Sequence, residues 1–281
     1  MANTRKGSYG VHNLSNGGQI KLPYVDGDVF PAKNLDNAWN DIDVHSVTTL
    51  QRFPVGTILE RHGKVYAYAE FGGTTAAGSL LQAEVPSTEQ DALAPEATAA
   101  GATQVEITSP ATGTNDIVLN EFAGGQMIAM VNGSPGYSYT IAANEAMDIS
   151  AAGNFLVTLA PGENLAVALA ATDDLSFSKN PWKEVIIHGS PQTAMIVGVS
   201  LAIGADGSYG WLGVKGLFAV LTEGTVVIGY EVRPGETTDG TVTAQVYDED
   251  VDADQGVVGK VADVGGNGEF SLIALNGLGL V

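Results

Sequence analysis

The stretch that most constrains this chain is residues 194–235, its most apolar part, which glycine interrupts throughout. Eight glycines fall between Gly198 and Gly229. Each glycine in a helix interior costs about 1 kcal/mol relative to alanine, so eight of them exclude a helix here. Short β-strands joined by tight turns remain, and the Asp206-Gly207 pair suits a hairpin turn because it tolerates positive φ. We expect strands over residues 195–203, 209–215 with a continuation to 221, and 225–232.

The rest of the chain shows the same organisation. Residues 57–60 and 64–70 flank the short Arg61-His62-Gly63 loop, and residues 65–70 alternate in polarity with period two, as in a hairpin. Further strand patterns recur every 8–12 residues, with turn residues between them, over 79–85, 103–108, 116–119, 126–131, 137–142, 155–159, 164–169, 174–177, 184–188, 257–264 and 269–275. The sequence therefore predicts an all-β protein with two β-sandwich or barrel-like domains of short antiparallel strands.

An extended N-terminal arm over residues 1–50 precedes these domains in the prediction. Glycine and proline punctuate the arm, and its apolar residues follow no helical or strand period, so it is either disordered or ordered on a partner. Its aromatic residues favour docking on a partner. A link around Pro181 divides the remainder into a β domain over 51–183 and a C-terminal β domain over 184–281.

The charge of the chain is unevenly distributed. Residues 1–65 hold seven basic and six acidic residues and have a net charge of +1. The whole chain has a net charge of −20, so the remaining 216 residues carry −21. A body this acidic does not bind nucleic acid by neutralising phosphates, and its charge favours solubility. We see no signal peptide and no apolar run of the ~18–20 residues that span a bilayer. We expect a protein made in the cytoplasm, without nucleic-acid or membrane partners.

The residue patterns of known catalytic sites are missing from the sequence. The chain has no cysteine, and its four histidines, His12, His45, His62 and His188, are too far apart for a local metal motif. No Gly-x-Ser-x-Gly motif precedes a helix, and the glycines at period three between Gly204 and Gly216 lack the Lys-Ser/Thr of a phosphate loop. The few aromatic residues are not gathered in the sequence as platforms for sugars. We expect no enzyme and no cofactor.

One acidic run is a candidate metal site. Asp248, Asp250, Asp252 and Asp254 alternate with other residues, so their carboxylates can face one side and gather a hard cation such as Ca²⁺. The run departs from an EF-hand loop, because Gln255 and Val261 stand where Gly and Glu are required. The alternative is an exposed, solvated loop, since like charges at this density repel one another.

Several segments together resemble a known group of proteins. They are GSYGWLGVKGLFAVLTEGTVVIGYEVRPGETTDGTV at 207–242, the late strands at 256–261 and 269–275, and the shorter segments 57–68, 76–78, 122–126 and 136–141. In style and order these segments are similar to capsid decoration proteins, also called head structural proteins, of tailed bacteriophages. The likeness covers roughly residues 50–281 and rests on no invariant chemical motif.

The resemblance implies a virion protein that binds the outer surface of a phage head and stabilises the lattice of the major capsid protein. It also implies a homo-oligomer, as a trimer or dimer, on the capsid exterior. The arm would then dock on the shell, and the following residues are its candidate contacts: Arg5, Lys6, Tyr9, Tyr24, Phe30 and Trp39. Two alternatives stay open, a tail or fibre-associated virion protein and a secreted carbohydrate-binding β module.

Overall fold

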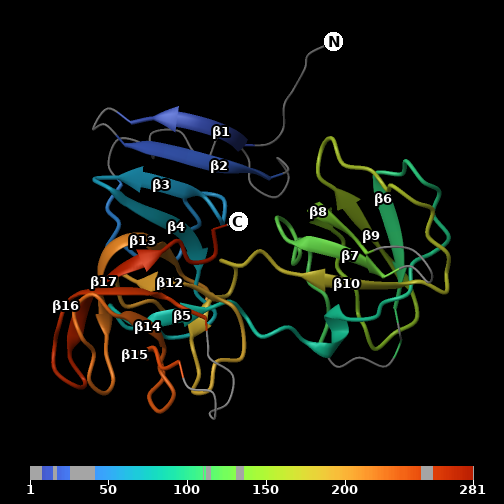
Figure 1. The fold of residues 1–281 in the computed structure, drawn as a ribbon. Helices are drawn as coiled ribbons and strands as arrows, with labels where there is room; N and C mark the ends of the chain where they lie inside the picture. The colour runs from blue at the N-terminus through green and yellow to red at the C-terminus, as the bar shows by residue number, and fades with distance from the viewer. Residues whose placement is uncertain are drawn as a thin grey trace. The chain divides into compact units, whose positions relative to one another are not determined.

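We describe the protein from a computed structural model, in which residues 8–14, 18–25, 42–109, 111, 115–130, 136–247 and 256–280 are described. Within these residues the chain is all-β, and a single 3₁₀ turn at Thr88–Gln90 is its one helical element (Figure 1). None of the described helical segments is long and apolar enough to cross a membrane. The chain separates into two compact units, one built on residues 86–180 and the other on residues 42–85 and 181–280.

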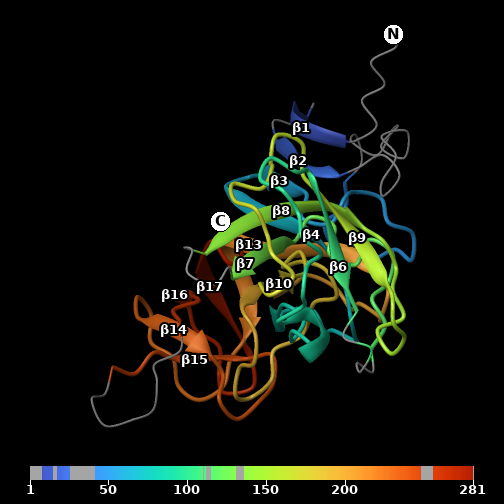
Figure 2. The same ribbon diagram turned by 90° about the vertical axis from the view of Figure 1, so that its right-hand side faces the viewer.

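A twelve-stranded sheet holds most of the strands, in the order β1-β2-β3-β4-β13-β17-β16-β14-β15, with β12, β5 and β11 attached beside β13 (Figures 1 and 2). Its members are β1 (Ser8–Asn13), β2 (Gln19–Val25), β3 (Ile58–Arg61), β4 (Lys64–Glu70), β5 (Leu80–Gln82), β11 (Ile186–Ile187), β12 (Ile196–Ser200), β13 (Tyr209–Leu221), β14 (Glu231–Pro234), β15 (Val242–Ala244), β16 (Gly259–Asp263) and β17 (Phe270–Asn276).

The long strand β13 organises this sheet. Its first half pairs antiparallel with β4, from Tyr209 opposite Glu70 to Lys215 opposite Val65, and its second half pairs antiparallel with β17. A bulge lies between Gly213 and Lys215, where the strand changes partners. Gly213 is required here, because a Cβ at this position would lie 2.6 Å from the Phe218 ring. One of the glycines that exclude a helix thus lies at the bend of a continuous strand.

Both faces of the first half of β13 are buried. One face packs in a cluster of Ala67, Ala69, Phe71, Leu81, Trp182, Val185, Val197, Leu212 and Val214. The other face carries aromatic rings, among which Tyr68 and Trp211 lie 5.1 Å apart between ring centroids. A strand that is buried on both sides has apolar residues at successive positions, which explains the composition of this part of the sequence.

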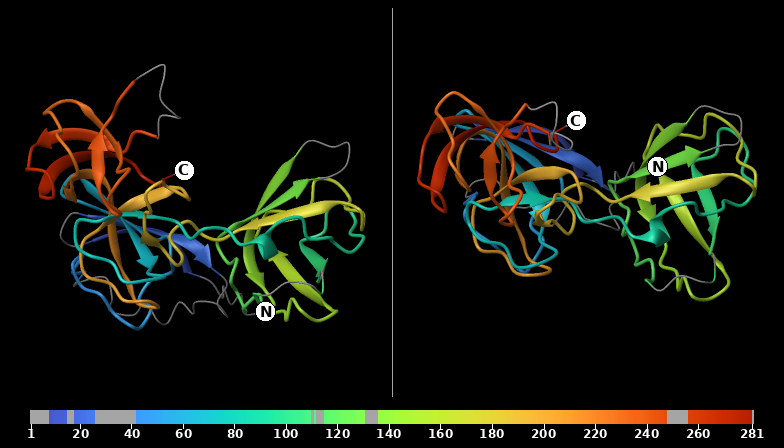
Figure 3. Two further views of the ribbon diagram at one scale, coloured as in Figure 1. Left: turned by 90° about the horizontal axis from the view of Figure 1, so that it is seen from below. Right: turned by 60° about the horizontal axis from the view of Figure 1, so that its bottom comes forward.

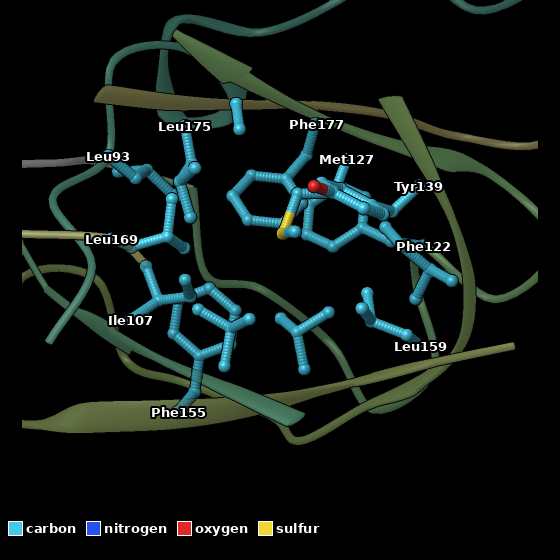
Figure 4. Packing of buried hydrophobic residues seen from close by; sticks show 14 of the residues in the cluster. Leu93, Ile107, Phe122, Met127, Tyr139, Phe155, Leu159, Leu169, Leu175 and Phe177 are labelled. Atoms are coloured by element: carbon cyan, nitrogen blue, oxygen red, sulfur yellow. The ribbon is translucent and has the colours of Figure 1, made fainter. Parts of the chain in front are cut away.

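The second sheet has five antiparallel strands in the order β10-β7-β8-β9-β6, seen in green and yellow in Figure 3. They are β6 (Gln104–Thr108), β7 (Gln126–Met130), β8 (Tyr137–Asn144), β9 (Asn154–Leu159) and β10 (Asp174–Ser178). Their alternating inward residues enclose an apolar core that includes Phe122, Phe155 and Phe177 (Figure 4). Residues 93–98 run along both edge strands, bonding Leu175 of β10 and Glu106 of β6, so these edges are covered.

The all-β prediction is confirmed, but the predicted division into domains differs from the observed one. Residues 58–70, which we assigned to the first β domain, form β3 and β4 and pair with β13 of the C-terminal segment. The unit of residues 86–180 is therefore inserted between two halves of the other. Sequence order did not reveal this, because backbone hydrogen bonds between strands join residues more than a hundred positions apart.

The N-terminal arm also differs from its prediction. Residues 19–21 of β2 pair antiparallel with β3, and the side chains of Leu14, Ile20 and Leu22 are buried. This part of the arm is therefore an integral edge of the sheet, since it supplies the ladder hydrogen bonds of β3 and covers Leu59. Removing residues 19–22 would therefore leave the edge of β3 unpaired and Leu59 exposed.

Three predicted strands are wrong. Residues 116–119 and 164–169 contribute only isolated bridges, Ile117 to Met147 and Leu169 to Thr98. Residues 225–230 form a loop that turns at Gly229, where φ is 84° and the backbone N–H donates a hydrogen bond to the Val261 carbonyl. The Arg61-His62-Gly63 hairpin is confirmed, with positive φ at both His62 and Gly63.

A buried carboxylate holds the loop between β14 and β15. Glu223 accepts hydrogen bonds from the amides of Glu236 (2.7 Å), Thr237 and Thr238 (2.8 Å), and from the hydroxyls of Thr237 and Thr241. Burial acts to raise the pKa of the Glu223 carboxyl, but these hydrogen bonds outweigh it and lower the pKa below its ordinary value.

We expect Glu223→Gln to destabilise the fold by about 2 kcal/mol at neutral pH, because a neutral amide accepts these bonds more weakly and places an NH₂ against donors. A carboxyl with a lowered folded-state pKa contributes stability above its unfolded pKa and loses it as the pH falls through the folded one. The wild type should thus approach the variant in stability below about pH 4.5. Urea unfolding at several pH values tests this, and a gap that is constant from pH 7 to pH 3 would contradict it.

Candidate docking surface

The second half of β13 and its partner β17 present an apolar surface on the side away from the core. Side chains alternate along both strands, and Leu217, Ala219 and Leu221 point outward on β13 because Phe218 and Val220 point inward. On β17 Phe270, Leu272 and Ala274 point outward in the same way. We call these six residues the outer face.

The register joins the six residues into one patch. Leu217 stands directly opposite Ala274, Ala219 opposite Leu272, and Leu221 opposite Phe270. Side chains in directly opposed positions lie about 4.5–5.5 Å apart at their Cβ atoms, so no polar side chain separates the pairs. The exposed fraction is 43% for Leu217, 54% for Phe270 and 37% for Leu272. The outer face is therefore continuous and open to solvent in this chain.

Such a face is unusual for a sheet that borders water. Antiparallel sheets with one solvated face alternate apolar residues inside with polar residues outside. Here both sides of β13 are apolar over residues 217–221, although one side is exposed. Contiguous exposed apolar patches mark interaction sites more often than single exposed residues do.

The polar rim of the outer face has a distinct charge. Lys215, opposite Asn276, ends the patch on one side, and Lys260 of β16 stands opposite Ala274. These are two of only five basic residues beyond position 65, a region that holds 26 acids. Lys260 lies 3.6 Å from Glu231, so this acid is partly neutralised. Asp263 of β16 stands opposite Leu272, so the rim carries both signs of charge, whereas the body is mostly acidic.

Phe270 is fixed by a glycine in the neighbouring loop. Gly78 has a φ of 81°, and a Cβ there would lie 2.4 Å from the Phe270 ring. The ring thus rests on bare backbone and leaves more than half of its surface exposed. This contact holds the largest side chain of the outer face in place without burying it.

Most of the predicted site residues lie outside the described part of the chain. These are Arg5, Lys6, Phe30 and Trp39 of the arm and the acidic candidates Asp248, Asp250, Asp252 and Asp254. Tyr9 and Tyr24 belong to β1 and β2, but their side chains are not among those described. The proposed roles of all ten residues stay predictions.

The histidines and acids that the structure does describe form no metal site. Within the described ranges, no group of three or more His, Cys, Asp and Glu side chains gathers around one point. His188 is buried, with its ring nitrogens 2.9 Å from the Gly189 carbonyl and 2.8 Å from that of Thr241. His45 lies 3.2 Å from the Leu201 carbonyl. Both imidazole rings therefore contact main-chain carbonyl groups.

Sequence reasoning missed the outer face. The signal was present, because residues 217–221 and 272–275 are apolar at successive positions and therefore on both sides of a strand. Local sequence does not separate the buried side of such a strand from an open one, and the pairing of β13 with β17 together with the exposed fractions shows which side is open.

Comparison of the chain with protein-family models, with curated proteins and with solved structures found no match.

Proposed function

We propose that this chain is a capsid decoration protein of a tailed bacteriophage, a non-enzymatic virion component that binds the outside of the head. The outer face carries the proposal, because a contiguous exposed apolar patch suits attachment to a large surface. The proposed partner is the major capsid protein. The segments that resemble decoration proteins include β13 and β17, which build this face.

The size of the outer face indicates how such binding would work. Burying a Leu or Phe side chain completely contributes about 1.5–3 kcal/mol, and the three largest side chains here are about half exposed, so each can contribute about 1 kcal/mol more. One copy would bind a shell weakly by this face alone. A trimer or dimer engaging several shell subunits gains 10²–10⁴ in avidity, roughly, without any new contact. We therefore include a homo-oligomer in the proposal.

We expect hundreds of copies of this chain in each particle, in simple ratio to the major shell protein. Quantitative mass spectrometry of virions purified from the phage that encodes the sequence measures this number directly. A dozen copies or fewer would place the protein in the tail or at the portal and favour the tail or fibre alternative. Absence from the particle would overturn the virion assignment.

A further inference from the structure

The unit of residues 42–85 and 181–280 contains a pocket of about 200 Å³ that the docking surface does not use. The pocket lies between the segment 42–53 and the strands β4 and β13. It is lined by Ile42, Asp43, Ser46, Thr48, Arg52, Phe53, Tyr68, Tyr209 and Trp211. We expected no gathering of aromatic residues as platforms for sugars, but tertiary packing brings four of them together here.

The aromatic residues of the lining pack against one another. The rings of Phe53, Tyr68 and Trp211 contact one another with centroids 5.1–5.4 Å apart, and the Tyr68 ring stacks on that of Tyr209 at 6.2 Å and an interplanar angle of 10°. Phe53, Tyr68 and Trp211 are buried and form the base, whereas Tyr209 is only partly buried and offers surface to a ligand. The Arg52 amide donates to the Tyr68 hydroxyl at 3.0 Å, which ties the segment to the base.

Polar residues also line the pocket. Asp43, Ser46 and Arg52 are exposed, and Thr48 is half-buried. Asp43 accepts a hydrogen bond from the His45 amide at 2.9 Å, and paired backbone bonds between Thr48 and Tyr209 fix the segment against β13. The lining thus combines an acidic acceptor, a guanidinium donor and hydroxyl groups with aromatic rings.

The tyrosine beside the polar groups stays neutral. Burial and the neighbouring Glu70 carboxylate, to which the Tyr209 hydroxyl donates at 3.3 Å, raise the pKa of Tyr209 to about 12. The charged groups of the lining are then Asp43 and Arg52, whose charges cancel. The body around them is strongly acidic and repels anions.

We propose that this pocket binds a single neutral sugar ring, such as the terminal residue of a glycan. Its volume is below the about 300–1,000 Å³ of sites for drug-sized molecules, so it admits one ring rather than a longer chain. A neutral sugar offers hydroxyl pairs to Asp43 and Arg52 and an apolar ring face to Tyr209. The balanced charge of the lining disfavours ionic ligands, because one of the two side chains would repel them.

The test is a titration of the full-length chain with neutral monosaccharides of the hexose and N-acetylhexosamine types, followed by Trp211 fluorescence and by amide NMR shifts. We expect at least one sugar to give a saturable signal with a dissociation constant of about 1 mM, the weak range typical of small ligands. Arg52→Met should weaken the binding of that sugar about tenfold, because a charged hydrogen-bond donor is lost. Lys21→Met, which removes a positive charge on β2 outside the pocket, should leave it unchanged.

Trp211→Phe should remove the fluorescence signal while NMR still reports binding, which assigns the signal to this pocket. Three results would overturn the proposal. They are the lack of a saturable signal with any neutral sugar, an equal loss of sugar affinity in the Arg52→Met and Lys21→Met variants, and tighter binding of a uronic acid than of its neutral counterpart. None of them bears on the copy number in virions, so the proposed function is tested separately.

Discussion

The Leu272→Asp variant is expected to bind phage heads about a hundredfold more weakly than the wild type, or not at all. Leu272 lies in the centre of the outer face, opposite Ala219, and the register also places it opposite Asp263 of β16. A carboxylate there would have to leave water on docking, which costs several kcal/mol unless the partner supplies a cation. The neighbouring Asp263 adds repulsion to that cost.

Binding is measured by sedimenting the purified protein with heads assembled without it and counting bound copies per head. Ile203→Asp is the matched control, because Ile203 is 74% exposed but lies outside the outer face. Leu272→Thr keeps a residue that favours strands while removing apolar surface, and it should show an intermediate loss. Circular dichroism verifies that each variant is folded. Equal binding by the Leu272→Asp and Ile203→Asp proteins would exclude the outer face as the docking surface.

The Gly125→Ala variant is expected to lose about 3 kcal/mol or more of the stability of the unit of residues 86–180. Gly125 lies between the Phe122 turn and β7, and a Cβ there would be 2.0 Å from the Ser178 carbonyl oxygen and 3.0 Å from that of Phe122. Both obstacles are backbone atoms, so no side-chain rotation relieves the clash. The end of β10 would have to move away from β7, which opens the core at Phe177.

Hydrogen exchange in increasing urea measures this effect by region. Peptides from residues 86–180 should lose protection at lower urea in the variant, while those from residues 190–280 keep theirs, because these residues belong to the other unit. Gly136→Ala is the control within the same unit, since a Cβ at Gly136 meets nothing within 4 Å. A Gly125→Ala protein as stable as the control would show that this close approach is not required.

Part of the fold could be predicted from local patterns. The hairpin of β3 and β4 follows from its alternating residues and from the glycine in its turn, and β6, β7, β8, β9, β10, β16 and β17 all fall within one or two residues of their predicted ranges. The segments 116–119 and 164–169 have the same apolar character but pair at a single residue each. Their residues favour strands, but each segment pairs with a neighbouring segment at only one residue. A strand forms only where several successive residues have a partner.

The all-β class follows from local patterns, since eight glycines exclude a helix from the most apolar stretch of the chain, and most turns follow as well, since these depend on two or three adjacent residues. Which strands are neighbours depends instead on contacts across the whole chain. The insertion of residues 86–180, the open side of β13 and the pocket that joins segment 42–53 to Tyr68 and Trp211 all depend on contacts between distant residues. Such contacts are selected by packing of the whole unit, and an apolar residue has the same local pattern whether the space beside it is filled or left to solvent.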